Sequence, residues 1–340
     1  MIEPAKVAVI GAGSWGTALS LQLARNGHTV HLWGHDPQHI DRLIKDKQNR
    51  EFLPGIEIPE NILPMSSLSQ AVSGASFVLL VIPSKAYREF LKQLKPLISP
   101  AMPVFWASKG FEIESGKFLH ELVVEELDVE HYGVISGPTF ASEVAKDLPA
   151  AVTCAGNHAQ TTQQVAELLH GGHFRCYTSS DVIGVEIGGA LKNVLAIGVG
   201  AVDGLGFGAN TRAALITRGL AEIMRFGERM GANRETLMGL SGLGDLILTS
   251  TDNQSRNRRF GLAVGQGMSV EQAMDSVHQT VEGYRASRAI HDIAQKVGVS
   301  LPIMEQIYLV LYQGKSLVDA VADLENREQK AETGYAYQGL

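Results

Sequence analysis

Residues 182–203 read VIGVEIGGALKNVLAIGVGAVD, and the rest of the chain is organised around this stretch. Between residues 187 and 202 its only charged residue is Lys192, which is followed by Asn193. A long and almost uniformly apolar segment in a soluble chain predicts a central, fully packed helix. The segment is a poor membrane span, because Glu186, Lys192 and Asn193 interrupt it and a lysine near the middle of a spanning helix costs roughly 2.5–3.5 kcal/mol.

Lys192 is a candidate catalytic residue. A buried ammonium is costly, so it either loses its proton or binds an anion. At helical spacing Lys192 shares a face with Gly188, Gly189 and Ala196, and these small residues predict a hollow beside the amine in which a ligand sits. The alternatives are a lysine whose amine reaches solvent, or one paired with a structural carboxylate. The functional interpretation is a general acid/base or a partner for a developing oxyanion.

The composition is that of a globular chain with two domains. With 340 residues, 45% of them hydrophobic, the chain is long enough to bury a sizeable core. The formal net charge of −7 gives no overall case for binding nucleic acid or an anionic membrane surface. The cysteines, Cys154 and Cys176, lack metal-site or redox spacing, no His/Cys/Asp cluster suggests a metal, and the N-terminus has no signal-type leader. We therefore expect a cytoplasmic protein with no metal and no membrane insertion.

A glycine loop near the N-terminus predicts a dinucleotide site. A short apolar strand at 7–10 runs directly into GAGSWG, which is followed by a helix and a second strand at 29–33. Gly11 suits the tight turn, Gly13 lets the backbone approach a pyrophosphate, and Gly16 allows close packing of helix on strand. The helix N-terminus offers free N–H groups to the phosphates. In this strand–loop–helix context the G-x-G-x-x-G spacing is a specific signal, whereas alone it is weak.

The residues after the second strand leave the choice between NAD and NADP open. Asp36 lies about 20 residues beyond the last glycine, which suits a contact to the adenosine ribose of NAD. However, Gly34 occupies the position directly after the strand where such an acid often lies, and His35 could face a 2′-phosphate instead. We expect NAD or NADP, with NADPH slightly favoured.

The pattern of strands and helices predicts the fold class. After a Pro-rich passage at 52–64, which we expect to cross the surface, strands are predicted at 77–83, 104–107, 133–137, 150–155 and 174–178. Every convincing segment from 181 onward is helical. We therefore expect an α/β domain with a Rossmann-type doubly wound sheet at 1–180, an all-α substrate and catalytic domain at 181–325, and a loose polar tail at 326–340.

Strand ends in a doubly wound sheet face the ligand crevice, and two of them carry candidate residues. Lys109 follows the predicted strand at 104–107, so it is well placed to reach a cofactor or substrate, although a solvated turn lysine is the alternative. The strand at 133–137 breaks at Gly137, Pro138 and Thr139 into a helix. The N–H groups of that helix start and the Thr139 hydroxyl are predicted to hold a ligand oxygen.

Polar residues among the later helices form a second group of candidates. Asp245 lies between apolar helical runs, where it either caps a helix or lies near Lys192 and keeps the amine charged. Ser255, Arg256 and Asn257 stand at a helix start and form a plausible phosphate cradle, since arginine suits a phosphate held by two hydrogen bonds. A solvated basic surface is the alternative for this run.

Taken in order, these motifs resemble those of the bacterial NAD(P)-dependent glycerol-3-phosphate dehydrogenase family. The resemblance runs from about residue 7 to residue 312 and rests on GAGSWGTALS, WGHD, SKGFE, SGPTFASEV, GGALKNVLAI, GLGDLILT, DNQSRNRRFG and VEGY. It implies a Rossmann-type domain, a helical C-terminal domain and a homodimer that binds a small phosphorylated substrate.

The resemblance also implies roles for individual residues. It makes Lys192 the catalytic acid/base. It implies cofactor contacts at Ser14, Trp15, His35, Lys109, Ala141, Arg256, Thr280 and Glu282. It implies substrate contacts at Lys109, Gly137, Thr139, Lys192, Asp245, Ser255, Arg256 and Asn257. The Thr280 position commonly carries an aliphatic residue in the family, so this sequence departs from the pattern there.

The reaction implied is reversible hydride transfer between NAD(P)H and C2 of dihydroxyacetone phosphate, giving sn-glycerol 3-phosphate for phospholipid synthesis. Lys192 would donate the proton that the new alkoxide takes up, and the phosphate cradle would align C2. Two alternatives stay open on the residues alone. One is a dehydrogenase of the same plan acting on a phosphorylated sugar acid or a hydroxy acid, and the other is a non-catalytic dinucleotide-binding sensor.

Overall fold

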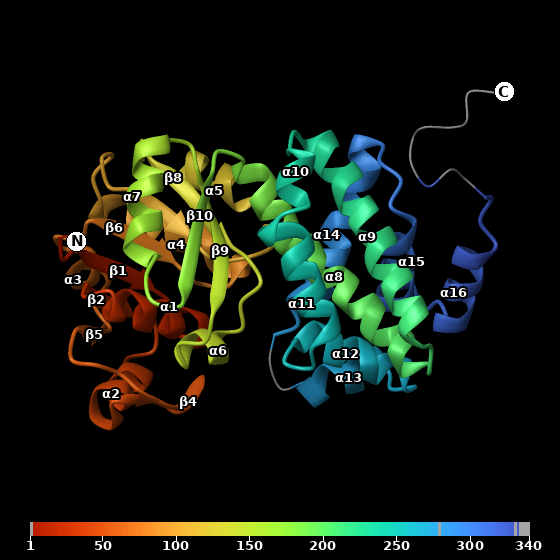
Figure 1. The fold of residues 1–340 in the computed structure, drawn as a ribbon, viewed down its shortest axis with the longest axis horizontal. Coiled ribbons are helices and arrows are strands. Elements are labelled where there is room, and N and C mark those ends of the chain that lie inside the picture. Colours follow the sequence, from red (N-terminus) through yellow and green to blue (C-terminus); the bar gives the residue numbers. More distant parts are fainter. Residues whose placement is uncertain (1–2, 278–279, 330–331, 333–340) are drawn as a thin grey trace.

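The computed structural model describes residues 3–277, 280–329 and 332. In Figure 1 a sheet with its covering helices forms one side of the molecule, and the helices from α8 onward form the other. Of the predicted loose tail, residues 326–329 and 332 belong to no helix or strand, and residues 330–331 and 333–340 lie outside the described residues.

Within the described residues, eight strands form one twisted sheet in the order β10-β9-β8-β7-β6-β1-β2-β5. They are β1 Lys6–Ile10, β2 Thr29–Trp33, β5 Ile62–Met65, β6 Phe77–Leu80, β7 Val104–Trp106, β8 Tyr132–Ser136, β9 Ala150–Gly156 and β10 Phe174–Ser179. The central strands are continuous apolar runs because both faces of the sheet are covered. The doubly wound fold class predicted from the sequence is therefore confirmed.

Helices cover both faces of this sheet and enclose two separate apolar cores. One face carries α1 Ser14–Arg25, α2 Pro37–Asp46, α6 Ala141–Ala145 and α7 Ala159–Leu169. The other carries α3 Leu68–Val72, α4 Tyr87–Leu94 and α5 Leu119–Glu126, with short 3₁₀ turns at Ser84–Ala86 and Lys95–Leu97. The start of α8 also packs on this second face, so the long helix begins against the sheet.

Two features of the sheet differ from the expectation. The passage at 52–64 does more than cross the surface, because it contains β4 Leu53–Glu57, which pairs with β3 Gln48–Asn49, and most of β5. Strand β5 joins the sheet edge beside β2, where Pro64 is tolerated because an edge strand has one side free of ladder hydrogen bonds. In addition, β8 and β9 pair antiparallel, whereas the other neighbouring strands of this sheet are parallel.

The central apolar stretch forms α8, Val182–Gly204, and helices surround it. They are α9 Ala209–Met230, α10 Arg234–Leu237, α11 Asp245–Thr251, α12 Arg256–Gly265, α13 Val270–Val277, α14 Glu282–Val297, α15 Pro302–Gln313 and α16 Leu317–Glu325. A π-helical turn, Leu240–Gly244, leads into α11. By length and composition α8 is the described helix apolar enough to cross a membrane, but 94% of its most apolar window is buried inside the protein. It is the core helix that the sequence predicts.

Glycines let α12 cross α8 at very short range. Gly200 and Gly204 of α8 and Gly261 and Gly265 of α12 lie at this crossing, where Gly204 and Gly265 approach each other directly. A Cβ at Gly200 would lie 2.1 Å from a carbonyl oxygen of α12, and a Cβ at Gly261 would lie 2.0 Å from a carbonyl oxygen of α8. The two backbones are therefore in direct contact, and a side chain larger than that of glycine at this crossing would push α12 away from α8.

Candidate active site

Lys192 is buried against a carboxylate at the middle of α8. The lysine is 7% exposed and Asp245, the first residue of α11, is 0% exposed. The Lys192 Nζ donates to Oδ1 of Asp245 at 2.5 Å and to Oγ1 of Thr249 at 2.8 Å. The ammonium has therefore found an anion, and the alternative in which its amine reaches solvent is wrong.

Lys109 binds the same carboxylate from the other side of the molecule. Its Nζ lies 2.6 Å from Oδ2 of Asp245, and its side chain is 16% exposed. Lys109 follows β7, so the lysine of the sheet side and Lys192 of the helical side meet on the two oxygens of Asp245. Asp245 caps no helix in the structure, since its carboxylate is occupied by the two amines.

The space beside Lys192 is filled by the protein itself. A Cβ at Gly188 would lie 2.4 Å from the carbonyl oxygen of Ser241 in the π-helical turn, so this turn packs directly on α8. A Cβ at Gly189 would lie 2.9 Å from Oγ of Ser136 and 3.5 Å from the Lys109 stem. The predicted hollow for a ligand at these glycines is therefore wrong. The missing side chains instead let Asp245 and Lys109 approach Lys192.

Burial sets the protonation of Lys192. Burial lowers the pKa of Lys192 to about 7, with a further lowering from Lys109 and an opposing effect from the Asp245 carboxylate. An amine with a pKa near 7 exists in both forms at neutral pH, so it can give and take a proton. The geometry and the pKa of Lys192 together suit a general acid/base.

A chain of amide hydrogen bonds runs past Lys192 to the starts of α12 and α14. The Nδ2 of Asn257 donates to Oδ1 of Asn193 at 2.9 Å, and the backbone N–H of Gly283 donates to Oδ1 of Asn257 at 2.9 Å. The Nδ2 of Asn193 lies 3.5 Å from Oε2 of Glu282. The structure therefore brings Asn257 and Glu282 together around the residue next to Lys192. Asn193 is therefore a site residue for which no role was predicted from the sequence.

Thr249 is a second residue that the sequence analysis missed. It lies one turn after Asp245 on α11, and its hydroxyl accepts from the Lys192 amine. The signal was present in the sequence, because residues four apart on a helix share a face. This spacing could be used to predict Thr249 only once the helix start at Asp245 was known.

The predicted phosphate cradle lies at the start of α12. Ser255 caps the helix, since its Oγ accepts from the backbone N–H of Arg258 at 3.2 Å. The amide of Asn257 is engaged with Asn193, as described above. Among the described residues, Arg256 makes no ion pair, so its guanidinium is the part of the cradle without a protein anion. The cradle stays a prediction, with Arg256 as its available cation.

The glycine loop has the geometry that a pyrophosphate requires. Gly11 has φ +124°, and a Cβ at Gly16 would lie 1.8 Å from the Gly11 carbonyl oxygen. No heavy atom lies within 4 Å of a Cβ built on Gly13, so this position faces open space. Gly13 precedes α1 without any side-chain cap, which leaves the N–H groups of the helix start for a ligand. The loop therefore fits a dinucleotide.

The residues around this loop take different positions. The Ser14 hydroxyl donates to the carbonyl of Phe52 at 2.7 Å, and Trp15 is partly buried. His35 is exposed. Asp36 caps α2, where its Oδ1 accepts from the backbone N–H of Gln38 at 2.9 Å. Of His35 and Asp36, the two side chains that could contact the adenosine ribose, His35 is therefore the more available.

The loop after β8 lies beside the turn that carries Asp245. A Cβ at Gly244 would lie 3.5 Å from Cγ of Pro138, which brings the two loops into contact. The Thr139 hydroxyl donates to the carbonyl of Gly137 at 3.3 Å, and Ala141 begins α6. Strands β1, β6, β7 and β8 are successive parallel neighbours, so the glycine loop, Lys109 and Gly137 lie at one edge of the sheet.

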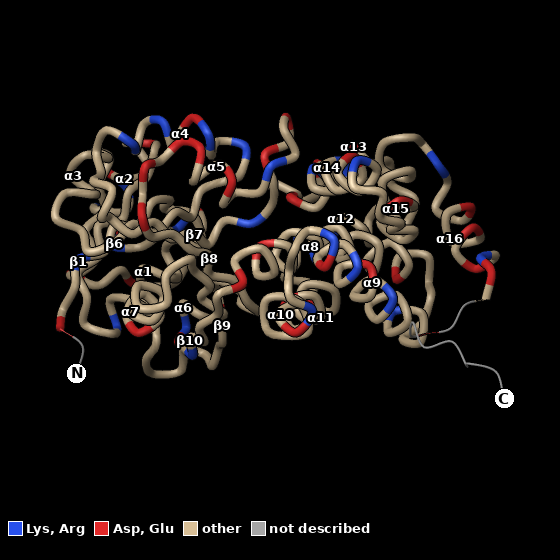
Figure 2. Tube along the Cα trace, turned by 90° about the horizontal axis from the view of Figure 1, so that it is seen from above, with Lys and Arg blue, Asp and Glu red and all other residues tan. Residues whose placement is uncertain are grey.

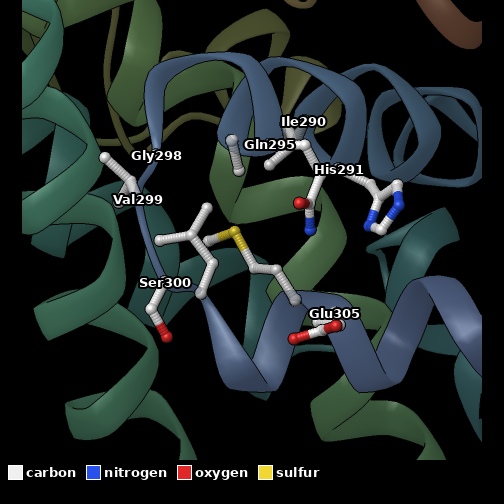
Figure 3. A pocket seen from close by; sticks show the side chains of 10 residues that line it. Ile290, His291, Gln295, Gly298, Val299, Ser300 and Glu305 are labelled. Carbon is white, nitrogen blue, oxygen red and sulfur yellow. The ribbon is translucent and has the colours of Figure 1, made fainter.

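Two further features stand apart from this group. Thr280 is exposed and directly follows residues 278–279, which the structure does not describe. A cavity of about 280 Å³ lies between the end of α14 and the start of α15 (Figure 3). Its wall includes His291, Gln295 and Glu305, and it contains none of the predicted site residues. This hollow of the helical part is therefore a surface groove separate from the predicted site.

The sheet, the open glycine loop and the buried lysine–carboxylate pair define a nicotinamide-dependent dehydrogenase. Family models described as the NAD-dependent glycerol-3-phosphate dehydrogenase N-terminus and C-terminus match residues 6–162 and 181–322. The chain belongs to the NAD(P)-dependent glycerol-3-phosphate dehydrogenase family, whose members are oxidoreductases acting on a CH–OH group.

Individual relatives agree over the whole chain. A glycerol-3-phosphate dehydrogenase (NAD(P)+) from Shewanella halifaxensis is 51% identical over 99% of this chain and 100% of its own. One from Tolumonas auensis is 52% identical over 96% of this chain and 98% of its own. The crystal structure of glycerol-3-phosphate dehydrogenase from Coxiella burnetii superposes with a TM-score of 0.92 at 43% identity, covering 95% and 99% of the two chains. The non-catalytic sensor and the dehydrogenase of another substrate class are therefore set aside.

Proposed function

We propose that Lys192 is the proton donor and acceptor in the reaction of this family, reversible hydride transfer between NAD(P)H and C2 of dihydroxyacetone phosphate. The observation that carries the proposal is the buried Lys192 amine held on Asp245 and Thr249. A bound nicotinamide supplies the hydride. As the carbonyl oxygen at C2 becomes an alkoxide, Lys192 gives it a proton, and in the reverse direction neutral Lys192 removes the proton of the hydroxyl.

Asp245 and Lys109 support this proton transfer. Asp245 orients the Lys192 amine through the 2.5 Å hydrogen bond, and its carboxylate favours the charged form of this amine. Lys109, on the other oxygen of Asp245, adds positive charge where the alkoxide develops. Both groups are held before substrate arrives, so little reorganisation is needed during the reaction.

Binding of the rest of the substrate falls to the loops around this pair. Arg256, with Ser255 and Asn257 at the start of α12, holds the phosphate, which lies remote from C2 and aligns it. Gly137 and Thr139 contact the substrate from the loop after β8. The cofactor is held by Gly11, Gly13, Ser14, Trp15, Gly16, His35, Lys109, Ala141, Arg256, Thr280 and Glu282.

The first experiment is the loss of NAD(P)H absorbance with dihydroxyacetone phosphate, measured with NADH and NADPH separately. Lys192→Ala is expected to lose turnover while keeping its affinity for the cofactor, because the lysine acts on the reacting oxygen. Lys296→Ala, an exposed lysine on α14, is the matched control and is expected to keep normal turnover. Near-normal turnover of Lys192→Ala would remove the proposed role of this residue.

The domain division, location, oligomeric state and metabolic role that we propose follow those of the family. We place the domain boundary at residue 180, between β10 and α8, with a substrate domain at 181–325. The enzyme works as a cytoplasmic homodimer that supplies glycerol 3-phosphate for phospholipid synthesis. A mass measured by light scattering in solution tests the dimer, and glycerol dependence of growth after loss of the protein tests the supply role.

A further inference from the structure

A second buried carboxylate on α8 has no part in the proposed proton transfer. Glu186 is 6% exposed, six residues before Lys192. Its Oε1 accepts from Nε1 of Trp106 at 3.1 Å and from the backbone N–H of His120 at 3.1 Å. Its Oε2 is hydrogen-bonded to Nδ1 of His120. One carboxylate of the helical side thus takes three hydrogen bonds from residues of the sheet side.

These partners lie on the elements that lead to the active site. Trp106 is the last residue of β7, and Lys109 follows it three residues later. His120 is the second residue of α5, which packs on the same face of the sheet. Glu186 therefore links the strand that carries Lys109 to the helix that carries Lys192. At about 100° per residue the two α8 side chains point about 120° apart, so Glu186 does not reach the amine and acts through the helix.

The surroundings make this link costly to break. Burial raises the pKa of Glu186. Burial also lowers the pKa of His120, but the hydrogen bond and the charge of Glu186 outweigh this effect and raise it. Removing the carboxylate would leave the buried indole N–H of Trp106 and the partly buried backbone N–H of His120 without this acceptor, and an unsatisfied donor of this kind is destabilising.

An apolar arm accompanies this link. Residues 111–118 leave the sheet side directly after Lys109 and place Phe111 and Phe118, whose ring centroids are 5.0 Å apart, in the core of the helical side. A Cβ at Gly116 of the arm would lie 3.3 Å from Ile293 of α14. Apolar contacts of this kind hold the two sides together, but they are not directional.

Ion pairs hold the arm on its own side. Arg88 of α4 binds both oxygens of Glu112, at 2.6 and 2.8 Å, and also reaches Glu125 and Glu126 of α5. Figure 2 shows basic and acidic positions around α4, whereas the charged positions of α5 are acidic. The arm and α5 are thus fixed to the sheet side. Within the part of the chain that the structure describes, the hydrogen bonds that join β7 and α5 to α8 are those of Glu186.

We propose that Glu186 is a positioning residue for the reaction: through Trp106 and His120 it holds α8 in register with the end of β7, so that Lys192 and Lys109 meet on Asp245. The proposal rests on the roles proposed above for the two lysines. Without Glu186 the apolar arm still joins the two sides, but α8 gains freedom to slide and turn. The amine of Lys192 then lies away from its productive position for part of the time.

The test compares Glu186→Ala with Glu186→Gln in the full-length enzyme. We expect Glu186→Ala to lower kcat about 10²-fold, the effect of a misplacement of roughly 1 Å, with KM for the cofactor nearly unchanged. Glu186→Gln keeps an oxygen for Trp106 and the His120 N–H, and its amide can donate to Nδ1 of neutral His120. Glu186→Gln is therefore expected to have a kcat close to that of the wild type. If Glu186→Ala lost activity only through lower overall stability, restoring these hydrogen bonds would not by itself restore kcat.

The matched control is Glu222→Ala. Glu222 is an equally buried carboxylate on α9 that accepts from the backbone N–H groups of Ile303 and Met304, at 2.7 and 3.1 Å, away from this link. It is expected to lower the melting temperature without lowering kcat of the folded enzyme. A Glu186→Ala enzyme with wild-type kcat, beside an inactive Lys192→Ala, overturns the inference alone. Turnover retained in Lys192→Ala overturns the proposed function instead.

A smaller change decides the matter if Glu186→Ala does not fold. Trp106→Phe removes one of the three hydrogen bonds to Glu186 and keeps an aromatic ring against Tyr132, on which Trp106 stacks with centroids 6.2 Å apart. We expect kcat to fall several-fold at constant KM, since the register of α8 is loosened. An unchanged kcat in this variant overturns the inference.

Discussion

Replacing Gly261 with alanine puts a methyl group at the crossing of α12 and α8. The new Cβ would lie 2.0 Å from the carbonyl oxygen of Ile197, whereas ordinary van der Waals contact begins at 3.4 Å. The neighbouring atoms are backbone atoms of a buried helix, so no side chain can turn away to make room. The helices must move apart by 1.4 Å at this point, the difference between the two distances.

This movement has consequences for activity and for stability. Because α12 begins at Arg256, a shift of the helix carries the proposed phosphate cradle away from Lys192. A misplacement of about 1 Å costs about 10²-fold in rate, so kcat/KM for dihydroxyacetone phosphate is expected to fall by about that factor. Overpacking costs about 1–3 kcal/mol and alanine returns up to about 1 kcal/mol as a better helix former, which leaves a net loss of about 1 kcal/mol.

The assay is steady-state NAD(P)H oxidation with varied dihydroxyacetone phosphate, beside thermal unfolding. Gly208→Ala is the matched control, since a Cβ at Gly208 has no heavy atom within 4 Å and its φ of −90° suits alanine. It is expected to keep its activity and, because Gly208 is the N-cap of α9, to lose no more than about 1 kcal/mol of stability. A folded Gly261→Ala enzyme with wild-type kcat/KM would refute the reasoning that this crossing holds the cradle in place.

Three further predictions concern protonation and the glycine loop. Because burial lowers the pKa of Lys192 to about 7, the rate of dihydroxyacetone phosphate reduction should fall as pH rises through about 7. Asp245→Asn removes the carboxylate that opposes this lowering, so in a pH–rate profile the fall should move to lower pH. A shift to higher pH would contradict this prediction. Burial raises the pKa of Glu222 to about 7, so the folded state binds this proton more tightly than the unfolded state. The contribution of this proton to the free energy of unfolding is complete below pH 4.5, the ordinary pKa, and is lost as pH rises towards 7, by up to about 1.4 kcal/mol for each pH unit. Urea unfolding at several pH values should show a smaller loss in Glu222→Gln than in the wild type. An equal loss in the two proteins would contradict this prediction. Gly13→Ala should weaken NAD(P)H binding at least about tenfold and, because Gly13 is the N-cap of α1, lose no more than about 1 kcal/mol of stability. Gly16→Ala, whose Cβ would lie 1.8 Å from a carbonyl oxygen, should lose more stability. Tight binding by Gly13→Ala would show that the cofactor lies elsewhere.

Much of the fold could be predicted because its strands are short apolar runs with clear ends. The strand before Gly11 and the glycine spacing identify the first βαβ unit, and the uniform apolar character of α8 identifies its central place. Strand β5 could not be found in this way, because Pro64 is unusual in a strand and only an edge position permits it. The pattern of apolar residues also carries no information on strand direction, so the antiparallel pairing of β9 with β8 could not be predicted.

Lys192 and Asp245 could be singled out from the sequence, and their contact was one of two alternatives for Asp245 between which only the structure could decide. A lysine inside an apolar helix indicates Lys192 because such a charge must have a partner, but Asp245 is 53 residues away in the sequence. Their contact depends on the close approach at Gly188, which the sequence analysis interpreted as space for a ligand. The linking role of Glu186 had no signal, since a single glutamate in a helix is ordinarily exposed.

The uniform apolar character of α8 has a consequence for biosynthesis. The helix ends at Gly204, but α12 and α14, which cover it, are complete only at Gly265 and Val297, about 90 residues later for the second. At roughly 5–20 residues per second, a ribosome takes about 5–20 s to make that length. During this time the nascent chain presents an uncovered apolar segment, and exposed apolar surface of this kind is prone to aggregate. The charge of Lys192 near the middle of the helix makes insertion of this uncovered segment into a membrane less favourable, by roughly 2.5–3.5 kcal/mol.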